Sequence, residues 1–441
     1  MQFTNELSCQ VLEKAPGLHI NIHSLPFAWG QDLPSALSEL FQHMKRQRSM
    51  QPAIMPLAGL GVTMMCSSTG LPAVGFASVG GDKRPASAEV LAKLNAAEAA
   101  NRELHNMFLR DDQDGHEFPA DLDLLGRQRG DYSLIAIVHA DGNGIGKKIM
   151  TIGQEPQNKA DSRTYIQEMR AFSQNLEHAS QAALWRTLRP LFQLRQVPVF
   201  TGDIANPFYK PEESQTVYLP FRPLVFGGDD VTFVCDGRLG LELAVEYLKA
   251  FEEETARSLG ERFTARAGVA IVKSHFPFAR AYELAEELGK SAKRYAPDHS
   301  GLDWHLSTSG LFGSLEDIRG REYRVPEGNL TLRPLALAGE APHSWETMRT
   351  IVNKFLCKTW QAKRNKAKAL REKLRGGRAS VQQFEQLYGQ ELPEVSGFKA
   401  GWHDESDENG QPTRVCGYFD ALELMDSYLP LYATEEPTDA V

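Results

Sequence analysis

The chain lacks a long apolar run and has few cysteines, and both features narrow the class of protein. No apolar stretch approaches about 18 residues, the length that a membrane-spanning helix needs, so we expect no membrane span. Residues 1–7 lack the basic region and apolar core of a signal peptide. The five cysteines, at positions 9, 66, 235, 357 and 416, are widely spaced and odd in number. They indicate reduced thiols in a cytoplasmic protein rather than a disulfide framework or a zinc site.

An overall excess of positive charge is also missing. The 441 residues carry a formal net charge of −9, with 42% hydrophobic and 24% charged residues, which is typical of a globular protein with two or three domains. One local exception is the run 363–378, in which eight basic residues accompany one acidic residue. Two interpretations stay open for this predicted helix: contact with the phosphates of RNA, or a solvated face that pairs with acidic groups elsewhere.

The most informative segment is 227–230, whose sequence is Gly-Gly-Asp-Asp. It lies between apolar runs at 223–226 and 231–235, so the pattern predicts two strands joined by a tight hairpin. Adjacent glycines accept the positive φ angles that such a turn requires. Two aspartates at its tip present the oxygen ligands that Mg²⁺ prefers, although glycine and aspartate also form ordinary turns.

A second acidic motif follows a predicted buried strand. The apolar run 133–140 leads directly into Asp141, which is followed by Gly-Asn-Gly. If the two predicted strands are neighbours, Asp141 meets Asp229 and Asp230. Three carboxylates so close together repel one another unless a cation neutralises them. Two divalent ions at this point would form a clamp for in-line displacement at phosphorus.

The order of these motifs resembles the palm domain of nucleotide polymerases and cyclases. A strand with Asp-Gly-Asn, a long helical stretch and a Gly-Gly-Asp-Asp hairpin are most similar to the polymerase-like large subunit of type III CRISPR effector complexes. The minimal stand-alone CRISPR polymerases related to that subunit are equally similar. The GGDEF diguanylate cyclases are more distant, because Asp-Asp-Val follows the two glycines here. The resemblance covers residues 131–309 well.

The resemblance implies an α+β fold with a ferredoxin-like (βαββαβ) palm domain. It also implies a metal-dependent nucleotidyltransferase that makes a cyclic di- or oligonucleotide messenger from an NTP, ATP above all, in antiviral defence. Such an enzyme uses Mg²⁺ or Mn²⁺, as two ions, and needs a homodimer or a partner palm domain for cyclisation. Two alternatives stay open: a non-catalytic palm-fold scaffold that binds nucleotide or RNA in an effector complex, and a diguanylate cyclase.

The resemblance also assigns roles to particular residues. The catalytic residues are Asp141, Asp229 and Asp230, and the metal ligands are these three with Gly142. The nucleotide-binding residues are Gly142, Asn143, Gly227, Gly228, Lys290 and Lys293. The two lysines lie three apart on one face of a predicted helix at 278–295 and would face a triphosphate. Lysines near a helix C-terminus are favoured by the helix dipole in any case, so one of the two could be merely solvated.

The pattern predicts three regions. Residues 1–125 form an N-terminal α/β domain, interpreted as a degenerate palm, with strands at 17–22 and 57–65 and helices at 33–44 and 89–109. Residues 126–315 form the catalytic palm domain. Its predicted strands are 134–140, 217–226, 231–235, 264–272 and 301–306, and its helices are about 161–190, 239–259 and 278–295. Residues 316–441 form a mostly helical region that carries the basic helix and ends in an acidic tail.

Overall fold

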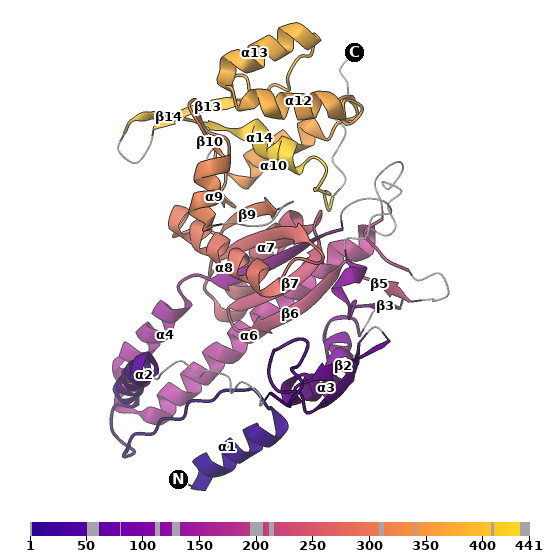
Figure 1. The fold of residues 1–441 in the computed structure, drawn as a ribbon. Helices are drawn as coiled ribbons and strands as arrows, with labels where there is room; N and C mark the ends of the chain where they lie inside the picture. Colours follow the sequence, from indigo (N-terminus) through magenta and orange to yellow (C-terminus); the bar gives the residue numbers. More distant parts are fainter. Residues whose placement is uncertain are drawn as a thin grey trace. The chain divides into compact units, whose positions relative to one another are not determined.

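The structure is a computed structural model of the chain (Figure 1). It describes residues 2–50, 61–79, 81–110, 115–125, 133–194, 206–210, 216–307, 313–339, 342–406 and 410–432. The chain divides into two compact units, one of residues Met1–Gln113 with Gly146–Arg170, the other of Asp114–Ile145 with Ala171–Val441. No helix in these described ranges is long and apolar enough to cross a membrane.

The first unit is largely helical. Its elements are α1 (Gln2–Lys14), α2 (Leu33–Met50), the hairpin β1 (Gly75–Val79) and β2 (Asp82–Ala86), α3 (Ala88–Phe108), most of α4 (Ile145–Gln154), α5 (Pro156–Ala160) and the start of α6 (Ser162–Leu194). The predicted helices at 33–44 and 89–109 are confirmed. Ser87 caps α3 by accepting a hydrogen bond from the backbone N–H of Val90.

The strand predicted at 17–22 is wrong. These residues are mostly exposed and have no strand partner in the described part of the unit, so the weak alternation has no sheet to join. Of the strand predicted at 57–65, residues 57–60 lie outside the described ranges, and 61–65 contribute a single bridge, between Met65 and Pro72. Since β1 and β2 are the only strands described in this unit, the structure lends no support to a degenerate palm there.

The second unit is built on a six-stranded sheet with the order β12-β9-β8-β4-β7-β6. The strands are β4 (Leu134–Gly142), β6 (Phe221–Gly227), β7 (Asp230–Asp236), β8 (Ala265–Lys273), β9 (Gly301–Ser307) and β12 (Leu335–Ala336). Neighbours are antiparallel except β8 and β9, which are parallel. The succession β4, α6, β6, β7, α7 (Gly240–Leu259), β8 has the predicted βαββαβ order.

The strand predicted at 217–226 is two strands. β5 (Val217–Tyr218) pairs with β3 (His116–Glu117), and β6 begins only at Phe221. Pro220 stands between them and has no N–H to donate to a sheet partner, which accounts for the break.

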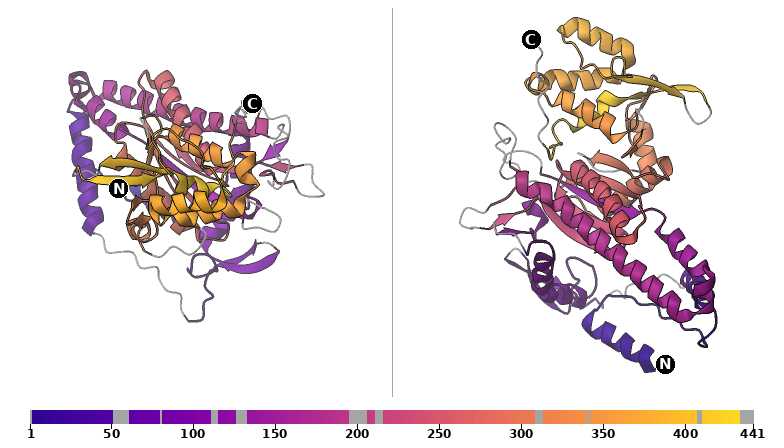
Figure 2. Two further views of the ribbon diagram at one scale, coloured as in Figure 1. Left: turned by 90° about the horizontal axis from the view of Figure 1, so that it is seen from above. Right: turned by 180° about the vertical axis from the view of Figure 1, so that it is seen from behind.

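Helices cover both faces of the sheet. α7 packs on one face, where a Cβ on Gly240 would lie 2.4 Å from the Cβ of Ala136. α8 (Phe278–Tyr295) packs on the other, where a Cβ on Gly268 would lie 1.9 Å from the carbonyl oxygen of Ala285. α8 lies in front of the sheet in Figure 1, and the long α6 lies in front of it when seen from behind in Figure 2. Two glycines therefore allow both helices to approach the strands closely.

The region after the sheet is mostly helical, as predicted, and also contains a small sheet. Its helices are α9 (Leu315–Glu322), α10 (Trp345–Phe355), α11 (Lys358–Gln361), α12 (Arg364–Leu374), α13 (Gly377–Tyr388) and α14 (Gly417–Leu424). The sheet has the order β10 (Arg324–Val325), β11 (Gly328–Asn329), β14 (Pro412–Cys416), β13 (Trp402–Ser406).

The basic run 363–378 contains α12 and the first two residues of α13, and much of its charge is engaged within the chain. Arg364 forms an ion pair with Asp426, and Arg378 forms one with Asp404 at 2.9 Å. Arg375 lies over the ring of Phe419, 4.9 Å from its centroid. These contacts favour the interpretation of a face that pairs with groups elsewhere in the protein. Contact with RNA stays a prediction.

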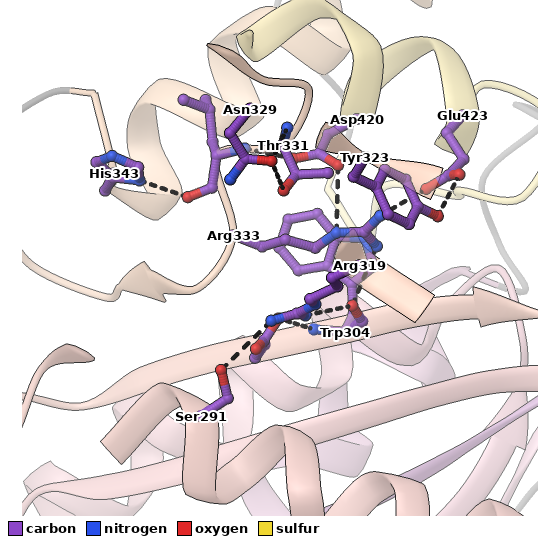
Figure 3. Close-up of polar contacts among 12 residues, drawn as sticks. Ser291, Trp304, Arg319, Tyr323, Asn329, Thr331, Arg333, His343, Asp420 and Glu423 are labelled. Carbon is purple, nitrogen blue, oxygen red and sulfur yellow. Dashed lines mark hydrogen bonds and ion pairs between the residues drawn. The ribbon is translucent and has the colours of Figure 1, made fainter. Parts of the chain in front are cut away.

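A buried arginine joins this region to the large sheet (Figure 3). Arg333 is 3% exposed and lies between α14 and β9. Its guanidinium forms an ion pair with Glu423 at 2.9 Å, lies 3.3 Å from Asp420 and donates to the carbonyl of Trp304 at 3.0 Å. The Asp420 contact is close enough for charge pairing but is not aligned as a hydrogen bond. The guanidinium also lies over the ring of Tyr323, 4.8 Å from its centroid. A buried charge is tolerated only when it is paired in this way.

We expect Arg333→Met to lower the free energy of unfolding by about 3–5 kcal/mol, because it leaves the carboxylate of Asp420 buried without a cation. Urea denaturation followed by circular dichroism measures the effect. The matched control is Arg321→Met, since Arg321 pairs with Glu322 on the exposed side of α9 and should change stability by less than about 0.5 kcal/mol. Adding Asp420→Asn to Arg333→Met should restore part of the loss. Equal stability of the two arginine variants would contradict the anchoring role.

Candidate functional site

The pairing of β4 with β7 brings the two acidic motifs together. Asp141 lies directly opposite Asp230 in the antiparallel register. Asp141 belongs to the strand, which extends two residues beyond the predicted end at 140, because Asp141 and Gly142 continue the pairing with β8. The predicted hairpin is confirmed: Gly227 pairs with Asp230, which leaves two residues in the turn.

Gly228 and Asp229 are the two turn residues. Gly228 has φ +64°, while φ of Asp229 is not positive, and this is the pattern of a type II′ turn with glycine at the first central position. An added Cβ at Gly227 or Gly228 would meet nothing within 4 Å, so the turn is open on that side.

Gly142 allows the hairpin tip to lie against the end of β4. A Cβ at this position would come within 2.8 Å of the Cβ of Asp229 and 3.3 Å of the Phe251 ring. The N–H of Gly142 donates to the carbonyl of Asp229 at 3.0 Å. A glycine is therefore required at position 142 to place Asp229 beside Asp141.

The alternation of side chains shows which face of the sheet carries the carboxylates. Ile135 and Ile137 of β4 pack in a core cluster with residues of α8, so Asp141 projects to the same face. Val234 of β7 belongs to that cluster as well, so Asp230 also faces α8. The site therefore lies between the end of the two strands and α8.

A histidine that the sequence analysis missed lies beside Asp230. His139 is buried, and its Nδ1 is 3.2 Å from Oγ1 of Thr232 and 3.3 Å from Oδ1 of Asp230. The ring of Tyr282, on α8, meets the imidazole edge to face at 5.5 Å between centroids. The signal that could have revealed His139 is its position two residues before Asp141, on the same face of the strand.

An arginine was missed as well. Arg266 of β8 is the register partner of Asp141 on its other side, and the two form an ion pair. Asn143 is buried, donates from its side chain to Oγ1 of Thr264 at 3.1 Å and accepts from Arg266 at 3.4 Å. Asn143 therefore fastens the end of β4 to β8.

Asp229 and Asp230 lie in a partly buried environment that disfavours their charged forms. Burial is the largest cause that raises the pKa of Asp229, followed among the raising effects by the charges of Asp141 and Asp230. Burial also raises the pKa of Asp230, against the opposing effect of His139. Concentrated carboxylates in a desolvated place are usual where a cation or a substrate compensates them.

The donor set suits a hard divalent cation, although it is not assembled as a finished site. Among the described residues, no three carboxylate, imidazole or thiolate groups are placed to hold one metal ion. Yet Oδ1 of Asp230 is buried and accepts no hydrogen bond, and oxygen atoms on Asp141 and Asp229 lie in the same site. Oxygen donors of this kind are those that Mg²⁺ and Mn²⁺ prefer. The residues present therefore fit such an ion.

The two predicted lysines lie on α8, on the same side of the sheet as the carboxylates. Lys290 is exposed and pairs with Glu286, one turn earlier, at 3.6 Å. Lys293 is exposed, in the last turn of the helix. In the described part of the chain, no hydrogen bond or ion pair joins either lysine to the three aspartates. The structure therefore unites Asp141, Asp229, Asp230, Gly142 and Asn143, and leaves the lysines nearby.

Because the pKa of Asp230 is raised, replacing its carboxyl should increase thermal stability by an amount that depends on pH. The folded chain binds more protons than the unfolded chain above about pH 4, so stability falls as the pH rises through the folded pKa. In EDTA at pH 7, Asp230→Asn should raise Tm by about 1–2 °C, a modest amount because the carboxyl is partly solvated. The gain should vanish below about pH 4. The control is Asp298→Asn, because Asp298 lies on an exposed turn. A lower Tm for Asp230→Asn than for the wild type at pH 7 would contradict the raised pKa of Asp230.

A comparison with protein families agrees with the motifs. The family model described as Cas10/Cmr2, second palm domain, matches residues 134–299. No curated protein matches the chain. Similar solved structures include Csm1 in T. onnurineus, with a TM-score of 0.41 and 13% identity over 70% of this chain and 40% of that one. A Csm1–Csm4 cassette in complex with cA4 has a TM-score of 0.36 and 13% identity over 67% and 36%. The cassette in complex with one ATP has a TM-score of 0.39 and 15% identity over 70% and 38%.

The chain thus spans less than half the length of these solved chains. The match to the family model runs from β4 to α8, and every site residue named above lies within it. The resemblance predicted from the motifs is confirmed for this segment: residues 134–299 match the second palm domain of the Cas10/Cmr2 family.

Proposed function

We propose that the chain is a metal-dependent nucleotidyltransferase that converts an NTP, ATP above all, into a cyclic di- or oligonucleotide messenger of CRISPR-type antiviral defence. The observation that carries the proposal is the register of β4 and β7, which sets Asp141 opposite Asp230 with Asp229 at the adjoining turn. This arrangement lies within the segment that matches the palm family.

The three carboxylates and the backbone carbonyl of Gly142 would hold two Mg²⁺ or Mn²⁺ ions. When bound, these ions supply Lewis acidity toward a ribose hydroxyl and neutralise the departing pyrophosphate. The protein's own contribution is placement. The β4–β7 register fixes Asp141 and Asp230, while the hydrogen bond from Gly142 fixes the backbone at Asp229. Desolvation at the site strengthens the interaction of the carboxylates with any cation.

The nucleotide would lie between the open side of the hairpin and α8. Gly227 and Gly228 leave the turn open, which allows a ligand to approach the backbone. Lys290 and Lys293, exposed on α8, would bind the triphosphate. Asn143 has its side chain engaged with Thr264 and Arg266, so its first role is to hold β4 against β8. Its direct contact with nucleotide stays a prediction.

Cyclisation requires two nucleotides that face each other, so we also propose a second palm, either in a homodimer or in a partner protein. The second candidate function is a non-catalytic scaffold that binds nucleotide. One observation favours it: in the described residues the carboxylates are not arranged as a metal-binding set, and Asp141 is already paired with Arg266. Product formation separates the two candidates. A diguanylate cyclase, the third alternative, would be identified by use of GTP.

The central test is incubation of the protein with each NTP and Mg²⁺ or Mn²⁺, with products identified by mass spectrometry. We expect a cyclic adenylate product from the wild type. Asp229→Asn combined with Asp230→Asn should lower its formation by at least about 1000-fold, because the electrostatic stabilisation of the reaction is lost. Asp298→Asn is the matched control and should retain wild-type activity. Undiminished product from the double variant would refute the proposal.

The lysines can be tested separately. Lys293→Ala should raise the KM for ATP about 10-fold with a smaller change in kcat, since loss of one charge contact to the triphosphate weakens ground-state binding. The same substitution at Lys354, an exposed lysine of α10, should change neither constant. Steady-state kinetics at saturating Mg²⁺ measures both. An unchanged KM for Lys293→Ala would place the triphosphate elsewhere, and Lys290→Ala would be the next variant.

A further inference from the structure

The cation nearest to the proposed metal ligands belongs to the protein itself. Arg266 and Asp141 are cross-strand partners in the β4–β8 register, and their side chains form an ion pair between Nη2 and Oδ2. The side chain of Arg266 is 15% exposed and that of Asp141 is 25% exposed. This pair is therefore shielded from water much more than a surface ion pair, and its interaction is correspondingly stronger.

Neighbouring groups hold the guanidinium in this position. Nη1 of Arg266 donates to Oδ1 of Asn143 at 3.4 Å, and Asn143 is fixed in turn by Thr264, through both its side chain (3.1 Å) and its backbone N–H (2.8 Å). On the side of α8, Gly289 leaves room: a Cβ there would lie 3.9 Å from Nε of Arg266. The arginine is thus held beside Asp141 by its hydrogen bond to Asn143, which Thr264 fixes in turn.

The charges of the site are not balanced by this one arginine. The charges of Asp141, Asp229 and Asp230 act on one another, and Glu286 of α8 adds a further negative charge near Asp230. Arg266 acts on all three aspartates, since it pairs with Asp141 and favours the charged forms of the other two. His139 stands beside Asp230. The chain therefore uses Arg266 as a counter-ion of the whole carboxylate group.

We propose that Arg266 is an exchangeable counter-ion: it neutralises Asp141 in the metal-free protein, gives way when a divalent cation binds there, and then contacts the phosphates of the incoming nucleotide. This inference rests on the proposed function and adds a substrate-positioning residue to it. A divalent cation bound to the Asp141 carboxylate would repel the guanidinium that pairs with the same carboxylate, so metal binding favours opening of the ion pair. The released guanidinium remains on β8 beside the site, and its planar N–H groups match phosphate oxygens.

The proposal predicts effects of opposite sign on two ligands. In Arg266→Met, the competitor for Asp141 is gone, so Mn²⁺ should bind about 10-fold more tightly in the absence of nucleotide. The same variant should bind α,β-methylene-ATP about 10-fold more weakly at saturating Mn²⁺, because a phosphate contact is lost. Electron paramagnetic resonance of free Mn²⁺ and isothermal titration calorimetry give the two affinities. Arg262→Met is the matched control, since Arg262 pairs with Glu252 away from the carboxylates and should alter neither affinity.

Thermal unfolding provides a second test in case Arg266→Met is less stable than the wild type. In EDTA, Arg266→Met should have a lower Tm than the wild type. In Mn²⁺ without EDTA, the rise in Tm should be larger for Arg266→Met than for the wild type. Arg266→Lys retains a charge without the planar fork and should fall between the wild type and Arg266→Met in both affinities. Affinities for Mn²⁺ that are unchanged or weaker in Arg266→Met overturn the exchange, and unchanged nucleotide affinity overturns the phosphate contact. If the wild type binds Mn²⁺ and forms product while Arg266→Met behaves like Arg262→Met, the role of Arg266 is wrong and the proposed function stands. If the wild type binds neither Mn²⁺ nor nucleotide, the proposed function is wrong as well.

Discussion

The register between β4 and β7 is the constraint on which the site depends. It sets two aspartates directly opposite each other, an arrangement of like charges that destabilises an antiparallel pair. The turn adds Asp229, which lies close because position 142 has no Cβ. The fold tolerates this concentration of charge because Arg266 enters from the neighbouring strand β8. The location, composition and counter-ion of the site thus follow from the strand order β8-β4-β7.

The remaining architecture holds this edge of the sheet in place. Gly240 and Gly268 allow α7 and α8 to clamp the strands from opposite faces. α8 is in turn connected to the C-terminal region, since Ser291 accepts a hydrogen bond from Arg319 (Figure 3). Arg319 is itself paired with the buried Asp303 of β9. The same region is anchored by Arg333. The helix that borders the site is therefore fixed on both sides, which suits a site whose geometry must be preorganised.

The sequence predicted those parts of the fold whose signals are local. α8 matches its predicted bounds, and the hairpin at 227–230 was indicated by its own glycines. Arg266 and His139 were missed because their roles come from pairing between strands that are distant in sequence, and no local pattern reports register. The prediction of a strand at 17–22 was wrong for a related reason: alternation alone does not supply a partner strand. Local chemistry was thus predictable, while cross-strand neighbours required the structure.

The loss of stability caused by the three clustered aspartates argues that they bind a ligand rather than serve a purely structural role. Three carboxylates face one arginine, and burial raises the pKa of both Asp229 and Asp230, so keeping them charged near neutral pH weakens the fold. Apolar or amide side chains at these positions would satisfy the hairpin without that cost. The sheet and helices around the site are otherwise mutually consistent. Locally destabilising residues in such a fold usually lie where function requires them. A divalent cation is the ligand whose charge and preference for oxygen ligands match this imbalance.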